Sequence, residues 1–183
     1  MPVPLINCLP IPADSARNSY NVGPEQIQAA LSDSTSAIII AHIGGQSVDM
    51  DPILEIARSR DIPVIEDCAQ AHGATYKGRL VGTLGDVAAF STMYGKHHAT
   101  GAQGGVVFTK NRVIYARVRQ IADRGKPFGM TGNVRNVVAS LNFNQDEISM
   151  AIGRVQLTGL PKTIAKRRRI VHLVANATCN LNN

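Results

Sequence analysis

Three residues with reactive side chains follow two apolar segments in the middle of the chain. Asp67 comes directly after the apolar stretch 63–66 (PVIE), and Ser91 and Lys96 lie five residues apart after a second apolar stretch that begins at Val87. A lysine amine that is poised as a nucleophile can form a Schiff base with an aldehyde. A carboxylate can keep a ring nitrogen protonated, and a hydroxyl with turn amides can hold a phosphate.

Each of these residues taken alone has an ordinary structural interpretation. Asp67 could cap a helix, Ser91 could be a strand-end hydroxyl, and Lys96 could be a solvated loop lysine, as most lysines are. The glycines in 99–105 (ATGAQGG) could be turn residues only. The combination is more specific, because it supplies an amine, a carboxylate and a hydroxyl at the ends of neighbouring strands. This pattern indicates pyridoxal 5′-phosphate (PLP) as the cofactor.

The elements that must position these residues alternate between strands and helices. Apolar runs rich in β-branched residues predict buried parallel strands, and apolar residues at helical spacing predict helices. The chain should therefore fold as a three-layer α/β/α domain with a mostly parallel central sheet, and its ligand should lie beyond the carboxyl ends of the strands. The predicted strands are Ala37–His42, Pro63–Glu66, Val87–Ser91 and Gly105–Thr109, and the predicted helices are Pro24–Leu31, Asp51–Arg60, Arg112–Asp123 and Asp146–Ala175, the last broken at Pro161.

The composition fits a globular chain that acts on a small molecule. Of 183 residues, 44% are hydrophobic, which is enough for one domain with a core or for one domain and part of another. Aromatic residues make up only 4% and tryptophan is absent, so a stacking surface for single-stranded nucleic acid is not expected. No apolar run approaches the ~20 residues of a membrane span. We therefore expect neither a nucleic-acid partner nor a membrane partner.

The charge distribution and the cysteine content bear on binding partners, metal binding and cellular location. The net charge of +6 includes a late basic cluster, which is interpreted as a solvated helix face, with attraction of an anionic substrate or a nucleic acid as the alternative. Cys8, Cys68 and Cys179 are too few and too scattered for a disulfide framework or a zinc site, so we expect no metal and a reducing cytoplasmic location. The basic cluster consists of Lys162, Lys166, Arg167, Arg168 and Arg169.

Two segments of the chain resemble the DegT/DnrJ/EryC1/StrS aminotransferases, namely 63–96 (PVIEDCAQAHGATYKGRLVGTLGDVAAFSTMYGK) and 101–111 (GAQGGVVFTKN). The resemblance runs from about residue 3 to residue 173. It implies a fold-type I PLP enzyme that transfers an amino group, from glutamate or glutamine, to a nucleotide-linked keto-sugar. Such reactions serve cell-surface polysaccharide or secondary-metabolite sugar biosynthesis.

The resemblance also assigns roles to individual residues. Asp67 would pair with the pyridine nitrogen of the cofactor and Gln70 would contact its ring hydroxyl. Ser91 would bind the phosphate, and Lys96 would form the Schiff base and act as the catalytic residue. Asn142, in the segment LNFNQDEISMAIGRVQL, falls on an asparagine that reaches the cofactor phosphate of a neighbouring subunit. That contact implies a homodimer with shared active sites.

Two histidines leave alternatives open. Counting forward from Phe90 places Lys96 at the cofactor position, whereas counting back from Gly104 places His97 there. Some relatives of this family have histidine in place of the lysine and are sugar dehydratases, so a PLP-dependent dehydratase with His97 as its base is the alternative. We favour Lys96, because Schiff-base chemistry requires an amine. His72 near the cofactor segment could contact the ring or the substrate, or be structural.

The chain also departs from the family. Gln103 stands where an acidic residue is usual, and Asn144 and Gln145 stand where Arg-Met is usual. Members are about twice as long, so we interpret the chain as a fragment. Residues 1–160 would form a partial PLP-binding large domain, and residues 161–183 a helix that leads towards a mostly absent carboxy-terminal domain. A truncated, non-catalytic regulatory relative is therefore a third hypothesis.

Overall fold

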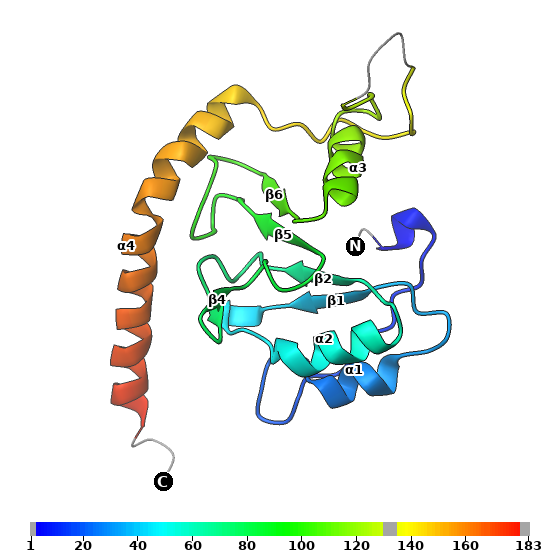
Figure 1. The fold of residues 1–183 in the computed structure, drawn as a ribbon. Helices are drawn as coiled ribbons and strands as arrows, with labels where there is room; N and C mark the ends of the chain where they lie inside the picture. Colours follow the sequence, from blue (N-terminus) through cyan, green and yellow to red (C-terminus); the bar gives the residue numbers. More distant parts are fainter. Residues whose placement is uncertain (1–2, 130–134, 180–183) are drawn as a thin grey trace. The chain divides into compact units, whose positions relative to one another are not determined.

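The computed structural model describes residues 3–129 and 135–179, and these divide into two compact units. The first unit comprises Met1–Ala89 with Phe108–Asn111, and the second comprises Phe90–Val107 with Arg112–Asn183. The architecture is α/β, with a four-stranded sheet in the order β1-β2-β5-β6 (Figure 1). Its strands are β1 (Ile38–Ala41), β2 (Val64–Asp67), β5 (Val87–Ser91) and β6 (Gly105–Phe108).

The central strand β2 runs parallel to both of its neighbours. Ile40 on β1 is the register partner of Glu66 on β2, and Glu66 is the partner of Ala88 on β5. All three side chains are fully buried, so this row of the sheet crosses the core of the first unit. The parallel pairing predicted from the apolar runs is confirmed, and it brings the carboxyl ends of β1 and β2 to one edge.

Helices α1 (Pro24–Ala30) and α2 (Met50–Ser59) lie side by side next to β1 (Figure 1). Helix α2 buries four apolar side chains at the spacing i, i+3, i+4 and i+7, which is the core-facing stripe of an amphipathic helix. They are Met50, Ile53, Leu54 and Ala57. The predictions of both helices from their apolar spacing are confirmed within one or two residues.

A two-stranded hairpin of β3 (Thr75–Tyr76) and β4 (Arg79–Leu80) was not predicted. Its turn residues Lys77 and Gly78 both have positive φ, +48° and +78°, as a tight type I′ turn requires. The Tyr76 hydroxyl donates to Asp49 just before α2, and this bond ties the hairpin to the start of that helix. Strands of two residues are too short to leave an alternating pattern in the sequence, and the hairpin was therefore missed.

The second unit contains α3 (Arg112–Ala122) and the long helix α4 (Glu147–Thr178). Asp146 caps α4 through a hydrogen bond from the Ser149 backbone N–H to Oδ1 at 2.8 Å. The prediction that Pro161 breaks this helix is wrong, because α4 continues through it. The φ of proline is compatible with a helix, so the ring removes one backbone hydrogen bond without forcing the chain out of helical conformation.

Two short 3₁₀ segments complete the described elements, η1 (Val3–Ile6) and η2 (Ile43–Gly45). Segment η2 follows β1 directly and lies at the carboxyl edge of the sheet, where the sequence places the ligand. The glycines that follow the predicted helix Arg112–Asp123 also suit turns, and one of them, Gly132, lies outside the described residues. No helix in the part of the chain that the structure describes has the length and apolar character needed to cross a membrane.

Candidate active site

The structure brings Asp67 and Gln70 together at the carboxyl edge of β1 and β2. Asp67 Oδ1 accepts a hydrogen bond from the Ala69 N–H at 2.9 Å, and Gln70 Oε1 accepts one from the Gly44 N–H at 2.8 Å. Both side chains are exposed, so both can reach a ligand. They line a pocket of about 40 Å³ together with Ala41, His42, Ile43 and Ala69.

Directly before Asp67, the Glu66 carboxylate is fully buried and accepts four hydrogen bonds. Oε2 accepts from His42 Nε2 at 3.1 Å and from the Gly82 N–H at 2.6 Å. Oε1 accepts from the Leu84 N–H at 2.8 Å and from the Gly85 N–H at 2.6 Å. Glu66 therefore ties β2 to the loop that precedes β5. In the sequence, Glu66 reads only as the last residue of a predicted strand, and no pattern there indicates this role.

The pKa of Glu66 reflects two opposed effects. Burial raises it, but the hydrogen bonds from His42 and from the backbone N–H groups of Gly85, Gly82 and Leu84 outweigh burial, so the pKa lies below its usual value. The carboxylate is thus ionised at neutral pH. A buried carboxylate with satisfied oxygens stabilises the fold only while it stays ionised.

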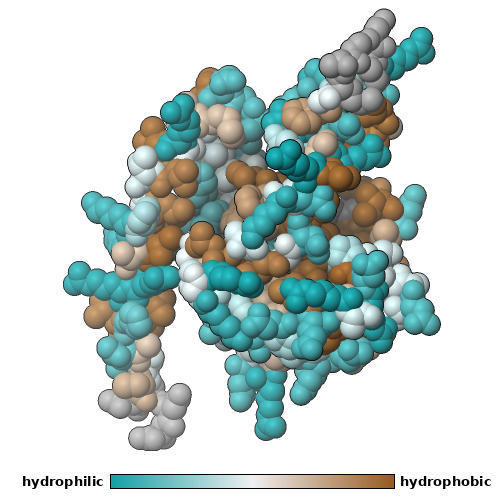
Figure 2. Space-filling model, in the orientation of Figure 1, coloured by the Kyte–Doolittle hydropathy of each residue, from teal (hydrophilic) through white to brown (hydrophobic). Residues whose placement is uncertain are grey.

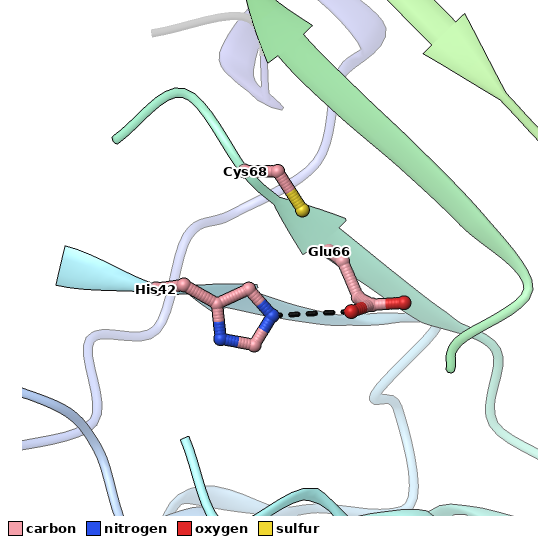
Figure 3. Close-up of side chains that lie close together, drawn as sticks. All are labelled: His42, Glu66 and Cys68. Carbon is pink, nitrogen blue, oxygen red and sulfur yellow. Dashed lines mark hydrogen bonds and ion pairs between the residues drawn. The ribbon is translucent and has the colours of Figure 1, made fainter. Parts of the chain in front are cut away.

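His42 has a defined tautomer in this network. Its Nδ1 accepts a hydrogen bond from the Val48 N–H at 3.1 Å, so the ring proton is on Nε2 and points at Glu66 (Figure 3). The imidazole is buried and connects the end of β1 to the start of α2. Its hydrogen bonds explain why a histidine lies inside an apolar core.

Cys68 lies beside this pair and completes a group of three potential metal ligands (Figure 3). Burial, followed by the negative charges of Glu66 and Asp67, raises the pKa of the Cys68 thiol to about 12. The thiol is therefore protonated at neutral pH and is neither a nucleophile nor a ready ligand. Because hydrogen bonds also occupy His42 Nδ1 and both Glu66 oxygens, this group has a structural role.

In the second unit, Lys96 lies on a loop that two buried threonines close. Three hydrogen bonds join Thr92 to Thr100. The two hydroxyls lie 2.9 Å apart. The Thr92 carbonyl accepts from the Thr100 N–H at 3.0 Å and from the Thr100 hydroxyl at 3.2 Å. The Thr92 N–H donates to the Gly104 carbonyl at 2.8 Å. An added Cβ at Gly104 would lie 2.6 Å from Thr92 Oγ1, so this position has room only for glycine.

Ser91 and Lys96 lie at the two ends of a tight turn in this loop. Ser91 ends β5, and its hydroxyl lies 3.4 Å from the Met93 N–H. The Lys96 N–H donates to the Met93 carbonyl at 2.9 Å. Both side chains are half-buried. The hydrogen bond between Lys96 and Met93 closes this turn and keeps Lys96 on the same loop as Ser91.

His97 and His72 have different surroundings. The pKa of His97 is lowered by burial, and further by the positive charges of Arg167 and Lys96, so its imidazole is neutral at neutral pH. A neutral imidazole can accept a proton. His72 is buried within the first unit, consistent with the structural alternative considered for it.

Asn142 lies on a separate strand-like segment of the second unit. It forms an isolated antiparallel bridge with Asp123, and its Oδ1 accepts from the Asn144 N–H at 3.1 Å. The side chain is exposed. The two unusual glutamines of this region contact each other, because Gln145 Nε2 donates to the Gln103 carbonyl at 3.1 Å.

Comparison with known proteins gives matches along almost the whole chain. The model of the DegT/DnrJ/EryC1/StrS aminotransferase family matches residues 2–182. GDP-perosamine synthase of Caulobacter vibrioides is 37% identical over 164 residues, which cover 88% of this chain and 43% of that protein. The chain therefore spans less than half the length of this curated relative.

Solved structures give the same result. An aminotransferase from Psychrobacter cryohalolentis superposes with a TM-score of 0.90 at 33% identity, covering 97% of this chain and 47% of that one. A GDP-4-keto-6-deoxymannose-3-dehydratase solved with bound GDP-perosamine superposes with a TM-score of 0.84 at 30% identity, covering 92% and 47%. Both an aminotransferase and a dehydratase are thus similar to this chain.

Replacing Glu66 by glutamine should destabilise the fold by about 3 kcal/mol, because the amide places a donor group among four donors. Glu55→Gln, on the exposed face of α2, is the matched control and should change the free energy of unfolding little. Urea unfolding followed by circular dichroism measures both. Equal stability of the two variants would contradict the role given to Glu66.

The lowered pKa of Glu66 also predicts how the stability of the fold depends on pH. A carboxylate whose folded-state pKa is lowered stabilises the fold above its unfolded-state pKa, and this stabilisation is lost as pH falls. From about pH 5 downwards, the wild-type chain should lose more free energy of unfolding than Glu66→Gln does.

Replacing Thr100 by valine should lower the free energy of unfolding by about 1–2 kcal/mol, because it leaves the buried Thr92 hydroxyl without its partner and removes one of the two hydrogen bonds to the Thr92 carbonyl. Thr100→Ser keeps the hydroxyl and should lose less. Equilibrium unfolding in urea compares the two variants. A valine variant at least as stable as the serine variant would show that the hydroxyl pair does not hold this loop.

Proposed function

The chain belongs to the DegT/DnrJ/EryC1/StrS aminotransferase family, and from this premise we propose that it works in the PLP-dependent transfer of an amino group to a nucleotide-linked keto-sugar. The observation that carries the proposal is the pairing of Asp67 and Gln70 on one pocket at the carboxyl edge of parallel strands. The similar protein from Caulobacter vibrioides is a GDP-perosamine synthase, which supports a nucleotide-sugar substrate.

The residues of this edge fit PLP. Hydrogen bonding to Ala69 fixes the Asp67 carboxylate through Oδ1, and Oδ2 forms no hydrogen bond within the described residues, so it can accept one from a ring nitrogen. PLP supplies the electron sink that lets an amino acid release its amine. We propose that Asp67 keeps the ring nitrogen protonated and that Gln70 meets the ring oxygen, while Ser91 and the turn amides that follow hold the phosphate.

Lys96 is proposed to hold the cofactor aldehyde through its amine and then to move the proton. With PLP bound, the Lys96 Nζ would act as a base that accepts a proton from the amino donor and returns it during the transfer. Overall, an amino acid and a keto-sugar become a 2-oxo acid and an amino-sugar, so atoms and electrons balance without a further reactant. We propose glutamate or glutamine as the donor and a ping-pong order.

A sugar dehydratase is the second candidate function, and His97 is the observation that favours it. Burial and the charges of Arg167 and Lys96 keep this imidazole neutral, as a base must be, and a dehydratase is among the similar structures. Product analysis separates the two candidates. An amino-sugar supports transfer by Lys96, whereas a deoxy-sugar without a new amine supports a dehydratase with His97 as base.

We also propose a homodimer in which Asn142 reaches the cofactor phosphate of the neighbouring subunit. Helix α4 supports it, because Ile148, Ile152 and Val155 lie at the spacing i, i+4 and i+7 and are 75%, 38% and 71% exposed. Figure 2 shows further apolar side chains at the surface of this helix. Exposed apolar stripes of this kind mark interfaces.

The cytoplasm is the proposed location. Cys8 and Cys179 are exposed and Cys68 is buried, and no disulfide joins these three described cysteines. Exposed free thiols suit a reducing compartment. Polysaccharide or secondary-metabolite sugar biosynthesis is the proposed role there, in line with the sugar enzymes that the chain resembles.

The Lys96→Ala variant should bind PLP without the visible absorbance band of the covalently held cofactor, because it lacks the attacking amine. Lys162→Ala on α4 removes an exposed lysine elsewhere and should keep the band, and His97→Ala should also keep it. Absorbance spectra after gel filtration with PLP compare the three variants. An unchanged spectrum in Lys96→Ala would remove its assigned role, and no PLP binding by any form would favour a non-catalytic relative.

Sedimentation equilibrium should give twice the chain mass for the wild-type protein, because apolar burial drives subunits together. Val155→Lys should shift it towards the monomer, and Gln156→Lys adds the same charge at the next position of α4 as a control. A wild-type protein that is monomeric, or a dimer that Val155→Lys leaves intact, would contradict the α4 interface.

A further inference from the structure

The Gln70 side chain spans from the segment after β2 to the segment after β1. Its Oε1 accepts the Gly44 N–H at 2.8 Å, and Gly44 belongs to η2. Gly44 has a φ of +65°, a left-handed conformation that favours glycine and that turns this N–H towards Gln70. One side of the amide is thus bound to the protein itself.

Segment η2 is held independently of Gln70. The Asn21 side chain is buried and forms a hydrogen bond at each end of the segment. Its Oδ1 accepts from the Ile43 N–H at 2.8 Å, and its Nδ2 donates to the Gln46 carbonyl at 3.0 Å. His42, just before it, is fixed by Val48. The Gly44 N–H is therefore a preset donor whose direction does not depend on a ligand.

A preset donor decides which end of the amide faces the pocket. With Nε2 in place of Oε1, two donors would face each other at 2.8 Å, which leaves both without a partner and is unfavourable. The carbonyl end of Gln70 is therefore committed to Gly44, and the NH₂ end is the one available to a ligand in the pocket. A group that meets the NH₂ end of Gln70 there has to be a hydrogen-bond acceptor.

We propose that the Gly44 backbone N–H fixes Gln70 as a hydrogen-bond donor to the ring oxygen of PLP and thereby favours the ionised form of that oxygen. Gly44 is a positioning residue in this arrangement, because it acts through Gln70. The inference rests on the proposed function for the identity of the ligand, while the direction of the amide rests on the hydrogen bonds alone.

Two measurements on the whole chain test the proposal. The first is the scalar coupling across the hydrogen bond between the Gly44 backbone nitrogen and the Gln70 side-chain carbonyl carbon, detected by NMR without cofactor. The second is a PLP titration, which gives the affinity for the cofactor. The same samples give the pH at which the visible absorbance band of the bound cofactor changes. The variants are Gln70→Glu, which keeps the acceptor for Gly44 and lacks the donor, and Gln70→Leu, which lacks both.

The coupling should be present in the wild-type chain and absent in Gln70→Leu. In Gln70→Glu it should be present between the Gly44 nitrogen and the carboxyl carbon of the new side chain. Gln70→Glu should bind PLP about tenfold more weakly and shift the pH transition upwards by about one unit, because a carboxylate repels the ionised ring oxygen. Gln28→Glu, which adds the same charge on the exposed face of α1, should leave both quantities unchanged.

Three results would contradict the proposal, and each contradicts a different part of it. A wild-type chain without the coupling would overturn the amide direction, whatever PLP does. Wild-type affinity and an unshifted pH transition in Gln70→Glu would overturn the donor role even if the coupling is seen. A wild-type chain that shows the coupling but binds no PLP at saturating cofactor would contradict the proposed function and the ring-oxygen assignment together.

Discussion

The buried carboxylate of Glu66 is the constraint on which the first unit depends. An ionised group in a core is unfavourable unless its oxygens are satisfied, and here four donors satisfy them. Three of these donors are backbone N–H groups of one loop, so the charge determines the path of that loop. Because side chains alternate along a strand, Glu66 inside the core places the next residue, Asp67, on the opposite face.

The same carboxylate orients groups at the edge of the sheet. It fixes the proton of His42 on Nε2, and the other ring nitrogen then holds the start of α2 through Val48. Between these anchors lies η2, whose Gly44 N–H reaches Gln70. The exposed polar residues of the pocket thus sit on a buried polar network, so their directions are set before any ligand arrives.

The sequence predicted most of the elements of this fold because their signals are local. Apolar runs gave the four strands of the main sheet, and the strand ends placed Asp67 and Gln70 at one edge. The support beneath them could not be predicted, because its donors are backbone groups of a glycine-containing loop that carry no side-chain pattern. The Thr92–Thr100 pair was missed for a similar reason, since a buried threonine looks like any other threonine in sequence. The roles of all five proposed site residues remain predictions, namely those of Asp67, Gln70, Ser91, Lys96 and Asn142.

The apolar side chains that are fully enclosed in the described part of the chain all belong to the first unit. In the second unit the enclosed side chains are polar, among them Thr92, Thr100 and Ser149. Burial of apolar surface is the main favourable term in folding, so the segment that carries Lys96 has little such stabilisation of its own. Its order is then thermodynamically linked to whatever covers α4. A second chain that covers this helix would raise the fraction of chains that are ready to bind the cofactor, in addition to any contact that its own Asn142 makes with the phosphate.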